Sequence, residues 1–119
     1  MILRLAAILV CMCSAALAQQ ETTVASGAVL RGLDKTSGTT KDIEMTAGAI
    51  VEFGRLSIVL RECRYPVGNP SGDAYAAVEV VEAGREGKVF SGWFIASAPA
   101  LSAMDHPRYD VWVMRCTTS

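Results

Sequence analysis

The sequence lacks a long apolar run, a basic stretch and any cluster of metal-ligating residues. Its longest apolar segment, residues 5–17, is shorter than the ~20 residues that span a bilayer. Its 11 Lys and Arg residues are dispersed among 12 Asp and Glu residues. There is consequently no basic patch of the kind that binds nucleic-acid phosphates or an anionic membrane surface. We expect no nucleic-acid partner and no stable membrane insertion once residues 1–18 are removed.

The catalytic and redox motifs that a short chain can carry are also missing. The sequence has a single histidine, His106, and no C-x-x-C pair. No serine is framed by G-x-S-x-G, the motif that presents a nucleophile in many hydrolases. We therefore predict no catalytic residue, no metal and no cofactor.

The first 18 residues have the layout of a secretory signal peptide. Arg4 precedes the apolar residues 5–17, and small residues occupy Ala16 and Ala18. This pattern predicts cleavage after Ala18 and, in a bacterium, a periplasmic location. Cleavage would remove two of the four cysteines and one basic residue, leaving a net charge of −2. Residues 19–27 are small and polar and are interpreted as a flexible leader, and residues 28–119 as a single β domain.

Cys63 and Cys116 remain after cleavage, and export would expose them to oxidising conditions. A pair of cysteines in that compartment usually forms a disulfide. The bond would close a loop of about 50 residues, worth roughly 4 kcal/mol in the chain-entropy model. A redox role and a metal site with His106 and Asp105 are weaker alternatives, because the spacing fits neither.

Alternating apolar and polar residues predict strands along most of the chain, separated by turns rich in Gly and Pro. Gly38 suits a turn with positive φ, and Gly54-Arg55 suits a two-residue hairpin turn. Pro99 and Pro107 bracket one short helical turn within residues 98–106. About seven strands without β-α-β spacing predict an all-β fold, a small antiparallel sandwich or barrel held by a disulfide. The predicted strands are 28–35, 39–46, 49–53, 56–65, 74–83, 88–97 and 108–116.

Strand alternation also makes predictions about faces. It places Cys63 opposite the face that carries Leu56, Ile58 and Leu60, and it places Trp112 on the same face as Cys116.

Residues 89–116 contain five of the eight aromatic residues, the histidine and the last cysteine. We interpret Trp93 and Trp112 as lying on neighbouring strands and packing the core beside the disulfide. The alternative is that Trp93, Trp112 and Tyr109 form an aromatic surface for a partner, since Trp and Tyr are frequent interface anchors.

A hydrolase is the competing functional class. It would use His106 as the base, Asp105 or Asp110 to orient it, and Ser91, Ser97 or Ser102 as the nucleophile. A lone histidine between an aspartate and a proline is more often a hydrogen-bonded loop residue, so this class is the weaker hypothesis.

The segment FSGWFIASAPALSAMDHPRYDVW, with VLRGLDKTSGTT and VEFGRLSIVLREC upstream, resembles a bacterial family known as domain of unknown function 2155. The resemblance covers residues 28–116, and the family pattern has cysteines where Cys63 and Cys116 stand. It implies an exported, single-domain protein, mostly of alphaproteobacteria, and brings no activity. It also implies an association, through neighbouring genes, with an accessory subunit of respiratory complex I.

The expected function is a non-enzymatic periplasmic binding or interaction domain with a protein partner that the sequence does not identify. The first alternative is an accessory or assembly subunit on the periplasmic face of a membrane complex such as respiratory complex I. The second is the hydrolase that uses His106.

Overall fold

The computed structural model describes residues 21–118, and in this range the chain forms eight strands and one 3-10 turn. The alternating pattern of the sequence explains the strands, because alternate side chains point into a shared core. The elements are β1 (Thr22–Val24), β2 (Gly27–Asp34), β3 (Thr39–Thr46), β4 (Ile50–Phe53), β5 (Leu56–Pro66), β6 (Tyr75–Glu82), β7 (Lys88–Ile95), η1 (Pro99–Ser102) and β8 (Tyr109–Thr117).

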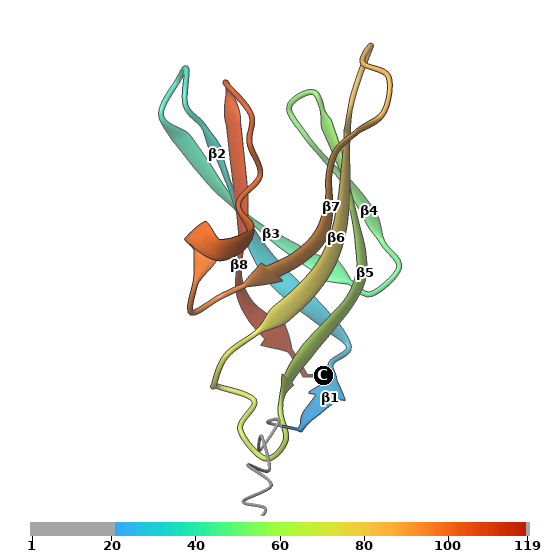
Figure 1. Ribbon diagram of the computed structural model, residues 1–119, viewed down its shortest axis with the longest axis vertical. Coiled ribbons are helices and arrows are strands. Elements are labelled where there is room, and N and C mark those ends of the chain that lie inside the picture. Colours follow the sequence, from blue (N-terminus) through green and yellow to red (C-terminus); the bar gives the residue numbers. More distant parts are fainter. Residues whose placement is uncertain (1–20, 119) are drawn as a thin grey trace, which may run out of the picture.

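The strands form two antiparallel sheets that face one another (Figure 1). The larger sheet has the order β1-β5-β6-β7, and β4 pairs with the same long β5 strand. The smaller sheet has the order β3-β2-β8. The predicted all-β antiparallel fold, a sandwich or small barrel of about seven strands, is therefore confirmed, as two sheets with eight strands. The predicted short helical turn is also confirmed and spans Pro99–Ser102.

One hydrophobic core draws on both sheets. Leu56, Ile58 and Leu60 of β5 contribute from the larger sheet, and Leu30 and Val113 contribute from the smaller one. All five are at most 2% exposed. Burial of such side chains is the main favourable term in folding, at ~25 cal/mol per Å² of apolar surface.

The turns that the sequence predicted are present. Gly38 has φ 74° between β2 and β3, and Gly54 has φ 56° between β4 and β5. Gly54 is also a point of close approach, because a Cβ there would lie 2.5 Å from the Tyr109 hydroxyl.

Residues 21–27 correct the prediction of a flexible leader. Thr22–Val24 form β1 and pair with Arg64–Pro66 of β5. Ala25 is 6% exposed and its amide donates to the Cys63 carbonyl at 2.8 Å, while the Ser26 amide donates to the Thr117 carbonyl at 3.1 Å. Small polar residues are compatible with flexibility, but here they supply the backbone bonds that carry the chain from one sheet to the other. The signal-peptide prediction and residues 19–20 lie outside the described residues.

The two sheets approach most closely at one end and splay apart toward the other (Figure 1). The disulfide end, as we call it, contains Cys63, Cys116, β1 and residues 25–27. The turn end contains the turns 34–39, 53–56 and 82–88 and the connection 103–109. Within residues 21–118, no helix is long and apolar enough to cross a membrane.

Candidate functional site

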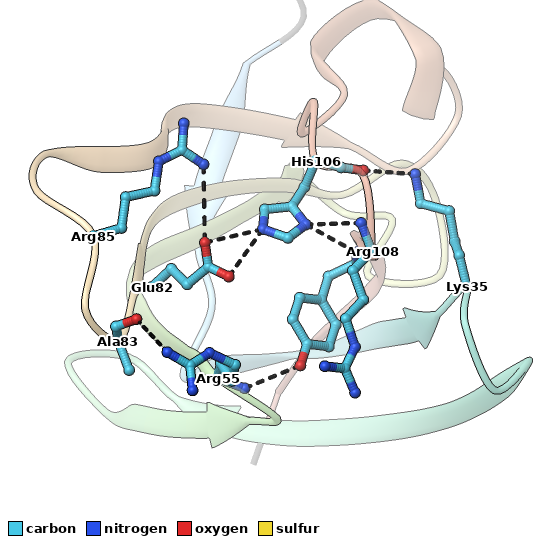
Figure 2. A network of polar contacts seen from close by, with 8 residues as sticks. Lys35, Arg55, Glu82, Ala83, Arg85, His106 and Arg108 are labelled. Atoms are coloured by element: carbon cyan, nitrogen blue, oxygen red, sulfur yellow. Dashed lines mark hydrogen bonds and ion pairs between the residues drawn. The ribbon is translucent and has the colours of Figure 1, made fainter.

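Among residues 21–118, His106 stands out as a polar side chain that is buried, with 5% exposure. Its Nδ1 accepts the backbone amides of Arg108, at 3.0 Å, and Tyr109, at 3.1 Å. Its Nε2 lies 3.2 Å from both carboxylate oxygens of Glu82 (Figure 2). Because Nδ1 accepts two bonds, the ring proton is on Nε2 and points at the carboxylate. The turn before β8 is thus tied to the end of β6 in the facing sheet.

Tyr109 makes the second tie between the sheets at this end. It is 1% exposed, and its hydroxyl accepts the Arg55 amide at 3.2 Å. Its ring meets Phe53 edge-on at 5.7 Å and lies 5.3 Å from the His106 ring. The Arg108 guanidinium covers the Tyr109 ring at 5.0 Å from its centroid. Tyr109 is therefore a core residue with a satisfied hydroxyl.

Charged side chains surround His106 and Tyr109 (Figure 2). The Lys35 ammonium donates to the His106 carbonyl at 2.7 Å, and Arg55 donates to the Ala83 carbonyl at 2.8 Å. Arg108 forms an ion pair with Asp34 at 3.1 Å. The hydrogen bond from that guanidinium holds the pKa of the Asp34 carboxyl below its ordinary value.

The hydrolase hypothesis required His106 beside an aspartate and a serine, and the structure gives a different partner. Glu82, not Asp105 or Asp110, contacts the ring, and Asp105 is exposed. In residues 21–118 both ring nitrogens are engaged by Glu82 and two amides, and neither contacts a serine. This arrangement is that of a positioned structural histidine rather than a base beside its nucleophile.

The candidate serines lie elsewhere. Ser97 donates its hydroxyl to Asp73 at 2.5 Å, and its amide donates to the same carboxylate at 2.9 Å. Ser91 is exposed on β7, and Ser102 lies in η1.

Cys63 and Cys116 form the predicted disulfide, with their Cα atoms 5.7 Å apart and 53 positions apart in sequence. The bond joins β5 to β8 and hence one sheet to the other. The sulfurs are bonded to each other, so they do not act as metal ligands with His106 in this arrangement. Within the described chain, no group of three His, Cys, Asp or Glu residues is placed to hold a metal ion.

The predicted faces of Cys63 and Trp112 are wrong, for one shared reason. Each strand contains a β-bulge, and one extra residue shifts the alternation by one position. The β5–β6 register passes from Leu60 to Glu62 and so skips Arg61. The β2–β8 register likewise skips Met114. Cys63 therefore joins Leu60 on the inner face, and Cys116 joins Val113 there while Trp112 points outward.

The two tryptophans do not lie on neighbouring strands or in the core. Trp93 is on β7, the edge of the larger sheet, and Trp112 is on β8, the edge of the smaller one. Trp93 is 41% exposed, and Trp112 is half-buried. A hollow of about 390 Å³ adjoins Trp112, lined also by Pro99, Ala100, Ala103, Asp110 and Val111. A larger hollow of about 1090 Å³ lies between the ends of β3 and β8 and residues 70–72.

Glu82 and Arg55 are the residues of this site that sequence reasoning missed. Glu82 is 24 positions from His106, and Arg55 is 54 positions from Tyr109. Each contact joins two sheets, so no local spacing signals it.

The fold and the site define a class: a small two-sheet β-protein with a disulfide at one end and, at the other, a buried histidine paired with a partly buried glutamate. The chain belongs to the family of domain of unknown function 2155, described as an uncharacterized protein conserved in bacteria, whose model matches residues 28–116. It is similar to an uncharacterized protein of Rickettsia prowazekii (strain Madrid E), with 28% identity over 87 residues. That match covers 71% of this chain and 56% of the relative, so the chain spans about half of the relative's length. No solved structure matches the chain.

Proposed function

We propose that the protein is an exported, non-enzymatic interaction domain of the bacterial periplasm that binds a protein partner. Three features support this proposal. The disulfide is typical of exported chains, the first 18 residues have the layout of a signal peptide, and both nitrogens of the single histidine serve structural contacts.

The observation that carries the binding proposal is the exposure of Trp93. Cross-strand pairs set Trp93 beside Ala77 and Ile95 beside Tyr75. Because Phe94 and Ala76 point into the core, these four residues share the outer face of β6 and β7. We call Tyr75, Ala77, Trp93 and Ile95 the outer patch. A Trp and a Tyr together on an open sheet face are typical anchors of protein interfaces.

The binding test compares Trp93→Ala with Trp112→Ala in protein purified with its partners from the cell envelope in mild detergent. Trp112 is the matched control, because it is also an outward-facing tryptophan on an edge strand. We expect Trp93→Ala to weaken a stoichiometric partner's binding by roughly thirtyfold, the effect of losing an interface hot spot, and Trp112→Ala to leave it unchanged. Equal retention of the partner by wild type and Trp93→Ala would contradict the proposal.

The same purification distinguishes a free periplasmic module from a subunit. A soluble partner supports the first. A stable membrane complex supports the alternative of an accessory or assembly subunit, for example of respiratory complex I.

The compartment is tested by cell fractionation of the full chain and of a form without residues 2–18. We expect the full chain in the periplasm and the shortened form in the cytoplasm. Finding both forms in the cytoplasm would contradict export.

A further inference from the structure

The edge strand β7 lacks the features that usually keep an exposed strand from pairing with another chain. Such features are charged side chains and short length. The strands β1 and β4 have only three and four residues. The longer edge strands carry charged residues, which are Lys41, Asp42 and Glu44 on β3 and Asp110 and Arg115 on β8. In β7, by contrast, the regular ladder from Phe90 to Ile95 contains no charged residue.

The backbone of β7 also presents hydrogen-bonding groups on its free side. The Ala96 amide donates to the Ala74 carbonyl at 2.9 Å, which fixes the alternation of bonded and non-bonded pairs along β6 and β7. The amides and carbonyls that consequently point away from β6 are those of Ser91, Trp93 and Ile95. Within residues 21–118, these groups have one backbone partner on that side, the Ala98 amide at 3.2 Å from the Ile95 carbonyl.

Apolar side chains flank this edge on both faces of the sheet. Trp93 is exposed and Ile95 half-buried on the outer face. On the inner face, the half-buried Phe90 stacks on Phe94 with 4.6 Å between ring centroids. A strand added to β7 would therefore bury apolar surface on both faces while it bonded the free backbone groups.

The edge is complementary to a second copy of itself. If two β7 strands run antiparallel with Trp93 opposite Trp93, Ser91 of one copy faces Ile95 of the other. All of these residues point their backbone groups outward, so the two sets of groups meet. Each Trp93 amide then donates to the other copy's Trp93 carbonyl, and each Ile95 amide to the other copy's Ser91 carbonyl. One two-fold axis relates these bonds, so the pairing closes at two copies.

The charges at the two ends of β7 favour the antiparallel direction. At its start, Lys88 and Arg61 both pair with Glu79, which leaves one positive charge in excess. At its end, the Asp73 carboxylate accepts the amide and the hydroxyl of Ser97, and no cation in residues 21–118 is bonded to it. Antiparallel pairing brings the positive end of each strand beside the negative end of the other, whereas parallel pairing would bring like charges together.

From this geometry we infer that two copies of the protein form a symmetric dimer by antiparallel pairing of their β7 strands. The larger sheets of the two copies become one continuous sheet, and the two outer patches lie side by side on it. An interface one strand wide falls below the ~1,200 Å² of a standard interface, so we expect a dissociation constant on the order of 10 µM. The inference does not depend on the proposed partner, which binds the outer face and not the edge.

The test is sedimentation velocity of the oxidised protein between about 1 µM and about 300 µM, a range that spans the expected dissociation constant. We expect the wild type to pass from monomer to dimer. Ser91→Pro removes an amide that points away from β6, so the β6–β7 ladder is kept while the dimer loses a donor and meets the proline ring. We expect this variant to dimerise at least roughly tenfold more weakly.

Thr40→Pro is the matched control, because Thr40 is an exposed hydroxyl residue on β3, an edge strand of the other sheet. The Ala47 amide donates to the Ser26 carbonyl at 3.0 Å, and the same alternation turns the Thr40 amide away from β2. We expect Thr40→Pro to dimerise as the wild type does.

Hydrogen exchange of the wild-type Trp93 amide gives a second readout that needs no variant. The amide is free in the monomer and bonded in the dimer, so its exchange should slow by roughly tenfold between the two ends of the concentration range. The Thr40 amide should exchange at the same rate at both ends.

A protein that stays monomeric up to the highest concentration would overturn the inference. A dimer that Ser91→Pro leaves unchanged, or that both proline variants weaken equally, would overturn it as well. The same holds for a Trp93 amide whose exchange does not depend on concentration, and this result decides the question if Ser91→Pro does not fold. Retention of a partner by Trp93→Ala bears on the outer patch alone, so the two proposals fail separately.

Discussion

The two ends of the sandwich are held together by different chemistry. At the disulfide end, one covalent bond joins β5 to β8, and the cross-strand neighbours of its cysteines are buried alanines, Ala76 and Ala28. At the turn end, where the sheets splay, His106 and Tyr109 make polar contacts with Glu82 and Arg55 of the facing sheet. The disulfide needs only two cysteines with small neighbours and an oxidising compartment. The polar contacts need several hydrogen-bonding groups to be placed correctly at the same time.

The two ends of the sandwich are therefore sensitive to different changes. The covalent tie depends on redox conditions. The polar tie is indifferent to redox conditions and depends on each hydrogen-bonding partner being present.

Removal of the disulfide should give the largest effect. A loop closed over 53 positions contributes about 4 kcal/mol in the chain-entropy model, a large share of a small domain's stability. Denaturant midpoints with and without reductant measure this, and Cys63→Ala with Cys116→Ala should reproduce the reduced value. An unchanged midpoint on reduction would show that the bond does not stabilise the fold.

His106→Ala should have the next largest effect, about 2–3 kcal/mol, because it leaves the Glu82 carboxylate and two amides without their partner. His106→Asn, which can still accept the amides, should cost less. Urea unfolding at neutral pH compares them. Equal destabilisation by the two variants would mean that the amide bonds contribute nothing.

Tyr109→Phe sharpens the comparison at the other polar tie. It removes the hydroxyl that accepts the Arg55 amide and keeps the ring packed on Phe53, so we expect a loss of about 1 kcal/mol. Urea midpoints of the two proteins give the value. A loss above ~3 kcal/mol would point to disrupted packing instead.

The smallest effect should come from Asp73, which ties residues 73–74 to Ser97 after β7. Burial raises the pKa of its carboxyl, but hydrogen bonds from Ser97, Ala74 and Tyr75 outweigh burial, so the pKa lies below its ordinary value. A lowered pKa stabilises the fold above the ordinary value, and this contribution is lost as pH falls through the folded-state pKa. Unfolding midpoints from pH 7 to pH 3 should fall less steeply for Asp73→Asn than for wild type. Parallel pH curves would remove Asp73 from the acid response.

Local patterns predicted the strands, the turns at Gly38 and Gly54, and the pairing of Cys63 with Cys116. Alternation and turn residues act over a few positions, and the pairing needed only a count of cysteines and a compartment. The faces of Cys63 and Trp112 were not predictable in this way. The bulges at Arg61 and Met114 exist only relative to a partner strand, and counting along one strand cannot detect them.

The contacts inside the turn end could also not be predicted from the sequence. The sequence predicts Tyr109 to be either a core or a partner-binding aromatic residue, and the structure places it in the core. Its link to Arg55 and the link from His106 to Glu82 cross between sheets, over 54 and 24 positions. The same long-range packing left Trp93 on an open face, where a core role had been the main interpretation.

The most direct test of this account is the redox state of Cys63 and Cys116 in the protein isolated from cells with its thiols alkylated. The account predicts that the exported protein has lost residues 1–18. It also predicts that the two cysteines form a disulfide and are therefore not alkylated by the reagent. Mass spectrometry that finds both thiols alkylated in the exported form would contradict it.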